Sequence, residues 1–376
     1  MASTTTTPLT GWVERSFDST HAITKLSIEL GAVYIFARTD LDKLTSSTTT
    51  ITIRSDNPTL LDALAVSESR GSELTLGWKT GLGRLIGQYV VEVVVPPRSI
   101  EAVSFSASGI GAVHANVLAS SSSSQLHLAN LGSGRLLVQE DTLEASGLSL
   151  RQTGSGFLQL TSPSAAIAGA LQLQNMGSGT VAIVAAALSA SYASLASSGS
   201  GSTLAVVKSS LRVADGIEMT NQGSGHVALH ADVLTTQRLS QSTLGSGAVD
   251  AVTTTHFFAA ALSMAVTGSG RIKCIGPGAA NTLKVNITGS GHAYTNVTAA
   301  MPAASKVAIV GSGSAHLSSM AVADVNLIGK GKVVKFETAP ATPEYLLSLL
   351  PVPTPQAVDF VPIGGITNLL TKALFR

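Results

Sequence analysis

The tripeptide Gly268-Ser269-Gly270 decides the fold, because it is one copy of a G-x-G unit that recurs along most of the chain. Successive copies start 18 to 24 residues apart. A fixed period of roughly 20 to 50 residues is typical of solenoid proteins. The repeat therefore predicts an elongated array built from one small unit. The copies begin at Gly109, Gly132, Gly154, Gly177, Gly199, Gly223, Gly245, Gly268, Gly289, Gly311 and Gly329.

Apolar residues stand two apart on both sides of each tripeptide. Positions +4 and +6 after the first glycine carry pairs such as Ile272 and Cys274, and positions −6 and −4 carry pairs such as Leu262 and Met264. On this alignment Val113 takes position +4 of the first repeat. Residues two apart lie on one face of a strand, and a looser apolar group further along supplies a third strand. The pattern predicts an all-β parallel β-helix of about eleven coils of about 22 residues.

Glycine at both ends of the tripeptide predicts a corner of the coil. Such a corner needs a residue with positive φ, or brings neighbouring coils too close for a Cβ. The middle residue is mostly serine, and we interpret the serine row as structural rather than as a ligand site. The glycines expected to form these structural turns are Gly132, Gly134, Gly154, Gly156, Gly177, Gly179, Gly223, Gly225, Gly245, Gly247, Gly268, Gly270, Gly289, Gly291, Gly311 and Gly313.

The chain divides into four expected parts. Residues 1–11 are rich in Ser and Thr and are expected to form a disordered leader. Residues 12–100 show strand patterns without the G-x-G period and are expected to form a β-rich cap that is continuous with the solenoid. Residues 101–335 hold the repeats. Residues 336–376 form a proline-containing tail with a short C-terminal helix, which we expect to fold onto the last coil.

Composition excludes several classes of protein. Charged residues make up 12% of the chain and the net charge is +1, which leaves no positive surplus for binding nucleic acid. The apolar runs are shorter than the ~20 residues of a membrane-spanning helix, so no transmembrane segment is expected. No signal peptide is visible in the first residues, which lack a basic start and an apolar core. The localisation is therefore left open by composition.

Catalysis on a β-helix needs carboxylates that gather on adjacent coils. The acids of the repeats do not do so. The best local group is Glu140, Asp141 and Glu144, which we interpret as a solvated turn. The sequence therefore predicts no catalytic residue.

Histidines and the single cysteine do not indicate a metal or cofactor site. His226 and His292 share a repeat position but lie three coils apart, and His114 and His316 share another at opposite ends of the rod. Because metal ligands must surround one ion, we interpret these histidines as surface residues. Cys274 falls in a column of apolar residues and is expected to be a small buried side chain. No cofactor is predicted.

Two N-x-T sequons begin at Asn286 and Asn296 and are candidate glycosylation sites. Asn286 lies between the inward-facing Val285 and Ile287, so its side chain is expected to point outward.

Several stretches carry a family resemblance. They are Val91–Pro96, Ile100, and Ser104–Gly111 followed by the repeated G-S-G, with Thr52–Asp56 and Gly71–Leu76 before them. Over about residues 20 to 335 the chain resembles the auto-transporter adhesin head GIN domain family. The resemblance implies a parallel β-helix, a secreted or cell-surface setting and no established enzymatic role.

The leading functional hypothesis is a non-enzymatic, adhesin-like scaffold that binds a surface protein or a glycan along its flank. One alternative is a polysaccharide-active β-helix enzyme whose catalytic groups converge from the cap and the repeats. Another is a structural or self-assembling rod.

Overall fold

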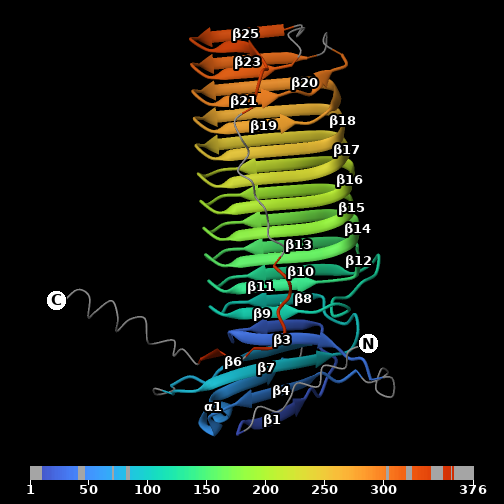
Figure 1. Ribbon diagram of the computed structural model, residues 1–376, viewed down its shortest axis with the longest axis vertical. Helices are drawn as coiled ribbons and strands as arrows, with labels where there is room; N and C mark the ends of the chain where they lie inside the picture. The colour runs from blue at the N-terminus through green and yellow to red at the C-terminus, as the bar shows by residue number, and fades with distance from the viewer. Residues whose placement is uncertain are drawn as a thin grey trace, which may run out of the picture.

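Stacked parallel strands wind into a rod in the computed structural model, with the cap at one end (Figure 1). The structure describes residues 11–40, 47–69, 72–81, 85–301, 305–318, 324–339, 350–356 and 358–359. The expected parallel β-solenoid is confirmed, and it makes about nine turns. The expected number of eleven coils is close. Near the first corner an isolated parallel bridge joins Ile100 to Leu118.

Each regular coil has three strand segments, which form three faces of the rod. Face 1 follows the G-x-G corner, face 2 lies in the middle of the coil, and face 3 leads into the next corner. The central strands are long enough to bend around all three faces. They are β14 (Phe157–Asn175), β15 (Thr180–Ser197), β16 (Ser202–Asn221), β17 (His226–Gly245) and β18 (Ala248–Gly268).

The remaining repeat strands are shorter and continue the same parallel ladders. Face 1 also contains β9 (Ile110–Val113), β11 (Arg135–Gln139), β19 (Arg271–Ile275), β21 (His292–Thr295), β24 (Ser314–Leu317) and β26 (Lys332–Lys335). Face 2 contains β12 (Thr142–Ala145), the start of β20 (Gly278–Gly289) and β22 (Thr298–Ala299). Face 3 contains β8 (Ala102–Phe105), β10 (Gln125–Asn130), β13 (Gly147–Gln152), the end of β20, β23 (Lys306–Gly311) and β25 (Asp324–Gly329).

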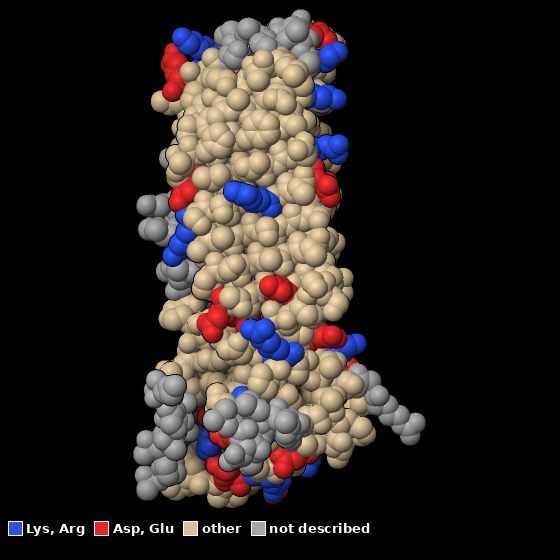
Figure 2. All heavy atoms as spheres, turned by 90° about the vertical axis from the view of Figure 1, so that its right-hand side faces the viewer, with Lys and Arg blue, Asp and Glu red and all other residues tan. Residues whose placement is uncertain are grey.

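The core is a column of inward side chains, because every second residue of a strand faces the same side. Ile272, Leu262 and Met264 are at most 1% exposed. Burial of such side chains contributes roughly 1.5 to 3 kcal/mol each. Outside the core, charged side chains are sparse along the repeats on the flank shown in Figure 2.

Glycine is required at the corners for two different reasons. In the corners from Gly132 to Gly223, a Cβ on the first glycine would lie 2.1 to 2.3 Å from a carbonyl oxygen of the preceding coil. From Gly245 to Gly329 the first glycine has a positive φ of 106° to 122°, which disfavours residues with a Cβ. In these later corners a Cβ would also lie 2.4 to 3.0 Å from a carbonyl oxygen of the preceding coil, so the positive φ is added to the close approach.

Buried asparagines two residues before the corner support the first kind of corner. Asn175 accepts a hydrogen bond from Gly177 N at 3.0 Å and donates to Gly179 O at 2.6 Å and to Ser202 O, in the next coil, at 3.1 Å. Asn130 and Asn221 bond in the same way. These side chains satisfy backbone groups that are buried at the corner. Further along, the equivalent position is apolar, as in Val266, Ile287 and Ile309.

The first repeat is offset by two residues from its expected alignment. β9 pairs with β11 so that Val113 lies beside Val138 at position +6, and Gly109 aligns with the second glycine of the next corner. The expectation that placed Val113 at +4 is therefore wrong. Gly111 is an inward position instead, where a Cβ would lie 2.8 Å from the ring of Phe105. Gly111 therefore makes room for the ring of Phe105 in the core and does not mark a corner of the coil.

The cap is not stacked in chain order. It contains β1 (Val13–Asp18), β2 (Lys25–Ile28), β3 (Ala32–Ala37), β4 (Thr50–Ser55), α1 (Pro58–Ala63), β5 (Leu64–Glu68), β6 (Glu73–Trp78) and β7 (Gln88–Val95). β2 and β3 form a coil between β8 and β9 on one side and β6 and β7 on the other. Beyond that coil, β4 pairs with β7, β1 with β4 and β5 with β6, all antiparallel. These strands cover the end of the parallel core.

The C-terminal segment lies near the cap. β27 (Val358–Asp359) pairs antiparallel with β7, and the Tyr34 hydroxyl donates to Gln356 O at 3.4 Å. Gln159 donates to Leu350 O at 3.1 Å. For the described residues 350–356 and 358–359, the expected fold onto the last coil is therefore wrong, because they contact β14, β3 and β7 towards the opposite end of the rod. The expected C-terminal helix lies outside the described residues, as does most of the expected leader.

Candidate functional site

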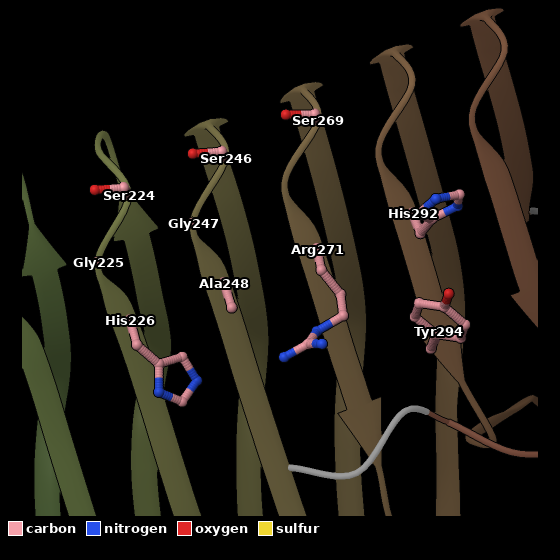
Figure 3. A pocket seen from close by; sticks show the side chains of 10 residues that line it. All are labelled: Ser224, Gly225, His226, Ser246, Gly247, Ala248, Ser269, Arg271, His292 and Tyr294. Carbon is pink, nitrogen blue, oxygen red and sulfur yellow. The ribbon is translucent and has the colours of Figure 1, made fainter. Parts of the chain in front are cut away.

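A shallow hollow with a volume of about 530 Å³ lies on the flank where four successive coils turn into face 1 (Figure 3). Its lining combines corner residues with the first residues of the face 1 strands. The lining residues are Ser224, Gly225, His226, Ser246, Gly247, Ala248, Ser269, Arg271, His292 and Tyr294. The hollow is therefore built from equivalent corner residues of four successive coils.

The small side chain of Ala248 leaves room in the middle of the hollow. His226, Ala248 and Arg271 are direct neighbours on β17, β18 and β19. Figure 3 shows the His226 ring and the Arg271 guanidinium on the two sides of Ala248, with His292 and Tyr294 on the next coil. A larger residue in place of Ala248 would fill this space.

A buried charge cluster lies beside the hollow, one outward position further along β18 and β19. Asp250 Oδ2 lies 3.1 Å from His226 Nε2, 3.4 Å from Lys273 Nζ and 3.9 Å from Arg271 Nη2. The side chains of Asp250 and Lys273 are fully buried, and 31% of the Arg271 side chain is exposed. One carboxylate therefore faces two fixed cations and an imidazole.

This cluster stands in a column that is otherwise uncharged in the preceding coils. The residues paired in turn before Asp250 are Ala228, Leu204 and Ala182. Burial lowers the pKa of Lys273, although the carboxylate of Asp250 favours the charged amine. Burial also lowers the pKa of His230, which lies on the same face. Apolar residues thus fit this position, and the charges are a local departure from the repeat.

Sequence reasoning missed this cluster and misassigned one of its members. His226 was expected at the surface, but it is 7% exposed and contacts Asp250. The surface interpretation of His226 is therefore wrong, because an outward position can be covered by its neighbours. The available signal was the pair Asp250 and Lys273, which occupy position +5 of consecutive repeats.

His292, His316 and His114 do not join the charge cluster. His292 Nδ1 lies 2.7 Å from Ser314 Oγ, and the ring of Tyr294 stacks on His316 at 4.5 Å between centroids. Burial lowers the pKa of His316. His114 stacks on Phe36 at 4.2 Å. Because of the two-residue offset, His114 does not share a position with His316, contrary to expectation.

The corner serines present hydroxyl groups along the rim of the hollow. Ser224, Ser246 and Ser269 are exposed, and their Oγ atoms point the same way in Figure 3. Within the described part of the chain, no hydrogen bond joins the hydroxyl of one of these serines to its neighbour. They therefore offer donors and acceptors to solvent or to a bound molecule.

Glu140 is not part of a solvated turn. It is 2% exposed, and its carboxylate accepts hydrogen bonds from the backbone N–H groups of Asn116 and Leu118, both at 2.8 Å. Burial raises its pKa to about 7, although these two bonds favour the ionised form. Asp141 and Glu144 are exposed as expected. The expectation for Glu140 is wrong because the loop before β10 folds over it.

The remaining candidate residues take the following places. Cys274 is a free thiol and is 1% exposed, so it is the buried side chain that was expected. Asn286 and Asn296 are half-buried, and Asn296 Oδ1 accepts a hydrogen bond from Gly276 N at 2.7 Å. Glycosylation at either asparagine stays a prediction.

The described residues contain no cluster of three or more His, Cys, Asp or Glu side chains that could hold a metal ion. In the same part of the chain, no helix has the length and apolar character needed to span a bilayer.

Comparisons with known proteins identify similar solved structures but no family for this chain. No family model matches the chain, and no curated protein matches it. The chain is similar to a crystal structure of a "putative adhesin" from Bacteroides fragilis, with 15% identity, a TM-score of 0.38, and coverage of 87% of this chain and 99% of that one. It is similar to a "putative adhesin" from Parabacteroides distasonis, with 11% identity, a TM-score of 0.35, and coverage of 86% and 96%.

A third neighbour is a "putative lipid binding protein" from Parabacteroides distasonis, with 13% identity, a TM-score of 0.36, and coverage of 86% and 97%. The neighbours are thus named as adhesins or as a lipid-binding protein. Membership of the GIN domain family stays a resemblance.

Proposed function

We propose that this protein is a non-enzymatic, adhesin-like scaffold that binds a surface glycan or protein through the hollow around Ala248. The single observation that supports the proposal is the hollow itself. It interrupts a regular flank and combines hydroxyl groups, a guanidinium and aromatic rings, which are the groups that give orientation and specificity to a binding site. The repeat holds these groups on a rigid array of strands.

The chemistry around the hollow favours binding over catalysis. Acid–base hydrolysis of a glycoside uses two carboxyl groups that flank the substrate. The ten residues that line the hollow carry none, and Asp250 beside them is fully buried. Glu140 is the best acidic candidate for the alternative function, a polysaccharide-active enzyme. Its carboxylate already accepts hydrogen bonds from two backbone N–H groups.

The hollow can be tested by filling it. Ala248→Trp places an indole between His226 and Arg271, whereas Thr180→Trp introduces the same side chain on the same ladder three coils away. Both variants and the wild-type protein would be screened on a glycan array and on intact cell surfaces. We expect Ala248→Trp to lose binding that Thr180→Trp retains. Equal binding by the two variants would contradict the proposed site.

The enzymatic alternative has its own test. Incubation of the protein with neutral and acidic polysaccharides should release no shorter products. Turnover that Asp250→Asn abolishes would replace the scaffold proposal with an enzyme. Intact mass of protein from its native source would show whether Asn286 or Asn296 carries a glycan.

A further inference from the structure

The two ends of the rod differ in how the parallel strands finish. At the cap, the antiparallel strands β1, β4 and β5 cover the end of the core. At the other end lie β25 and β26, the last strands of the repeats (Figure 1). Among the described residues, β25 pairs only with β23 and β26 only with β24. We call β25 and β26 the open end, because an unpaired strand edge can pair with another chain.

Core side chains reach the surface at the open end. Val325 pairs with Val307, and Leu327 with Ile309, so all four point inward. Val307 and Ile309 are at most 1% exposed, whereas Val325 is 47% and Leu327 45% exposed. Every residue of β25 is exposed. The apolar column therefore ends in solvent, and a partner that covers it gains free energy from the hydrophobic effect.

The backbone of β25 is ready to pair with a further strand. Lys330 N donates to Gly311 O of the preceding coil at 2.9 Å. In a parallel ladder alternate residues direct both backbone groups to the same neighbour, so the even-numbered residues of β25 bond to β23. The odd-numbered residues, which include Val325, Leu327 and Gly329, direct their N–H and C=O groups to the open end.

A second copy of β25 is complementary to the first when the two strands run antiparallel. With Leu327 opposite Leu327 of the second copy, Val325 lies opposite Gly329, and these are the residues whose backbone groups are directed outward. The same register places Asp324 opposite Lys330 on the solvent side, once on each side of the two-fold axis. Opposite charges in this arrangement stabilise an antiparallel pair.

The charges near β25 are consistent with this register. Asp324 Oδ2 lies 3.4 Å from Lys306 Nζ, in the preceding coil, and both side chains are exposed. Lys330 has no ion pair among the described residues. Because a two-fold axis through β25 exchanges the other two faces of the rod, the two β26 strands do not face each other, and Lys332 and Lys335 are not brought against their own copies.

We propose that two copies of this protein join at their open ends through antiparallel pairing of β25, with Leu327 on the two-fold axis. The contact uses the same surface on both copies, so assembly closes at a dimer with the two caps at its far ends. This inference does not depend on the ligand of the hollow. A dimer carries two hollows, which raises avidity for a surface that displays many copies of a ligand.

Sedimentation velocity of the full chain over a range of concentrations tests the dimer. We expect monomers at low concentration and dimers at high concentration. Leu327→Asp places two carboxylates together on the axis and should weaken the dimer at least about tenfold. Leu131→Asp is the matched control, because Leu131 is 46% exposed at the corner of another coil. Thermal unfolding would verify that both variants fold.

Three results of that experiment would overturn the inference. A wild-type protein that stays monomeric would mean that the end is covered by its own chain or by another partner. Growth beyond the dimer would indicate head-to-tail stacking. Dimers that folded Leu327→Asp retains would place the contact elsewhere.

Charge reversal separates the proposed contact from a general loss of stability. Asp324→Lys brings two lysines together at each side of the axis and should weaken the dimer. The double variant Asp324→Lys, Lys330→Asp restores opposite charges across the interface and should recover dimerisation. A double variant that dimerises no better than the single one would contradict the pairing of Asp324 with Lys330.

Single cysteines test the register. Leu327→Cys places two thiols on residues whose Cα atoms lie about 5.5 Å apart in a hydrogen-bonded antiparallel pair, within the range that a disulfide spans. In Val325→Cys the two thiols lie on residues roughly 14 Å apart along the strands. Mild oxidation should therefore link Leu327→Cys into a covalent dimer and leave Val325→Cys unlinked. The reverse result would overturn the register.

Discussion

Asp250 and Lys273 are direct partners on neighbouring parallel strands, and their Oδ2 and Nζ atoms lie 3.4 Å apart with both side chains fully buried. They point away from the core, in a column whose three preceding residues, Ala228, Leu204 and Ala182, are apolar. The two charges stabilise each other, because removal of either one takes a close opposite charge away from a fully buried partner.

Removal of one partner should therefore cost more than removal of both. Asp250→Ala leaves Lys273 buried and should lower the free energy of unfolding by about 3 to 5 kcal/mol. The double variant Asp250→Ala, Lys273→Leu resembles the column at Ala228 and Leu204, and should recover most of that loss. Urea denaturation of the wild-type, single and double variants measures the difference. A double variant as unstable as the single one would show that the pair is not mutually dependent.

Glu140 should make stability depend on pH. Its pKa is raised from 4.5 to about 7 in the folded protein, so the folded state holds the proton more tightly than the unfolded chain. Its contribution to stability is full below about pH 4.5, and it is lost as the pH rises through about 7. Glu140→Gln should flatten this part of the stability profile.

Chemical denaturation between pH 4 and pH 8 measures the effect of Glu140. Asp141→Asn is the control, because Asp141 is adjacent and exposed. The amide introduced by Glu140→Gln would also present an N–H donor to one of the two backbone N–H groups whose hydrogen bonds Glu140 accepts, so a loss of about 1 to 3 kcal/mol is expected at low pH. Identical pH profiles for the wild-type protein and Glu140→Gln would contradict the raised pKa.

The corner glycines should tolerate alanine poorly where coils are close. A Cβ at Gly177 would lie 2.2 Å from Gly154 O, so Gly177→Ala must push two coils apart and should lower the melting temperature by several degrees. Gly216 lies within a strand, and a Cβ there would meet its nearest atom at 3.3 Å. Gly216→Ala should therefore have a small effect in the same thermal scan. Equal melting temperatures would argue against close approach as the reason for glycine.

Cys274 should be inert in the folded protein. Burial raises the pKa of its thiol and keeps the thiolate form scarce. A colourless aromatic disulfide reagent should react with the native protein only at the rate of unfolding, and at once in denaturant. Fast reaction under native conditions would mean that the coil around Cys274 opens readily.

Much of the fold was predictable from particular residues. The G-x-G spacing set the coil, and pairs such as Ile272 and Cys274 identified the inward side of face 1. The first repeat was misaligned because Gly109-Ile110-Gly111 matches the G-x-G pattern of the corners. Gly111 makes room for the ring of Phe105. Because Phe105 belongs to another strand, the sequence pattern around Gly111 does not reveal this contact.

The candidate site was less predictable. His226, Asp250 and Lys273 are three different residue types, so a comparison of like residues at like repeat positions does not reveal them as a group. Its members belong to three coils, and their contact depends on register across about 22 residues of intervening chain. Glu140 was misread for a similar reason, because the backbone groups that bury it come from the preceding coil.

The sequence by itself determined the parallel solenoid, because glycines at a regular interval and apolar residues two apart are compatible with few other backbones. Tertiary structure alone decided the order of the cap strands, the pairing of Val358–Asp359 with β7, and the hollow beside Asp250. Each of these depends on which side chains and unpaired strand edges meet between coils. The local pattern specifies how one coil turns, but contacts between coils are set only when the whole stack has formed.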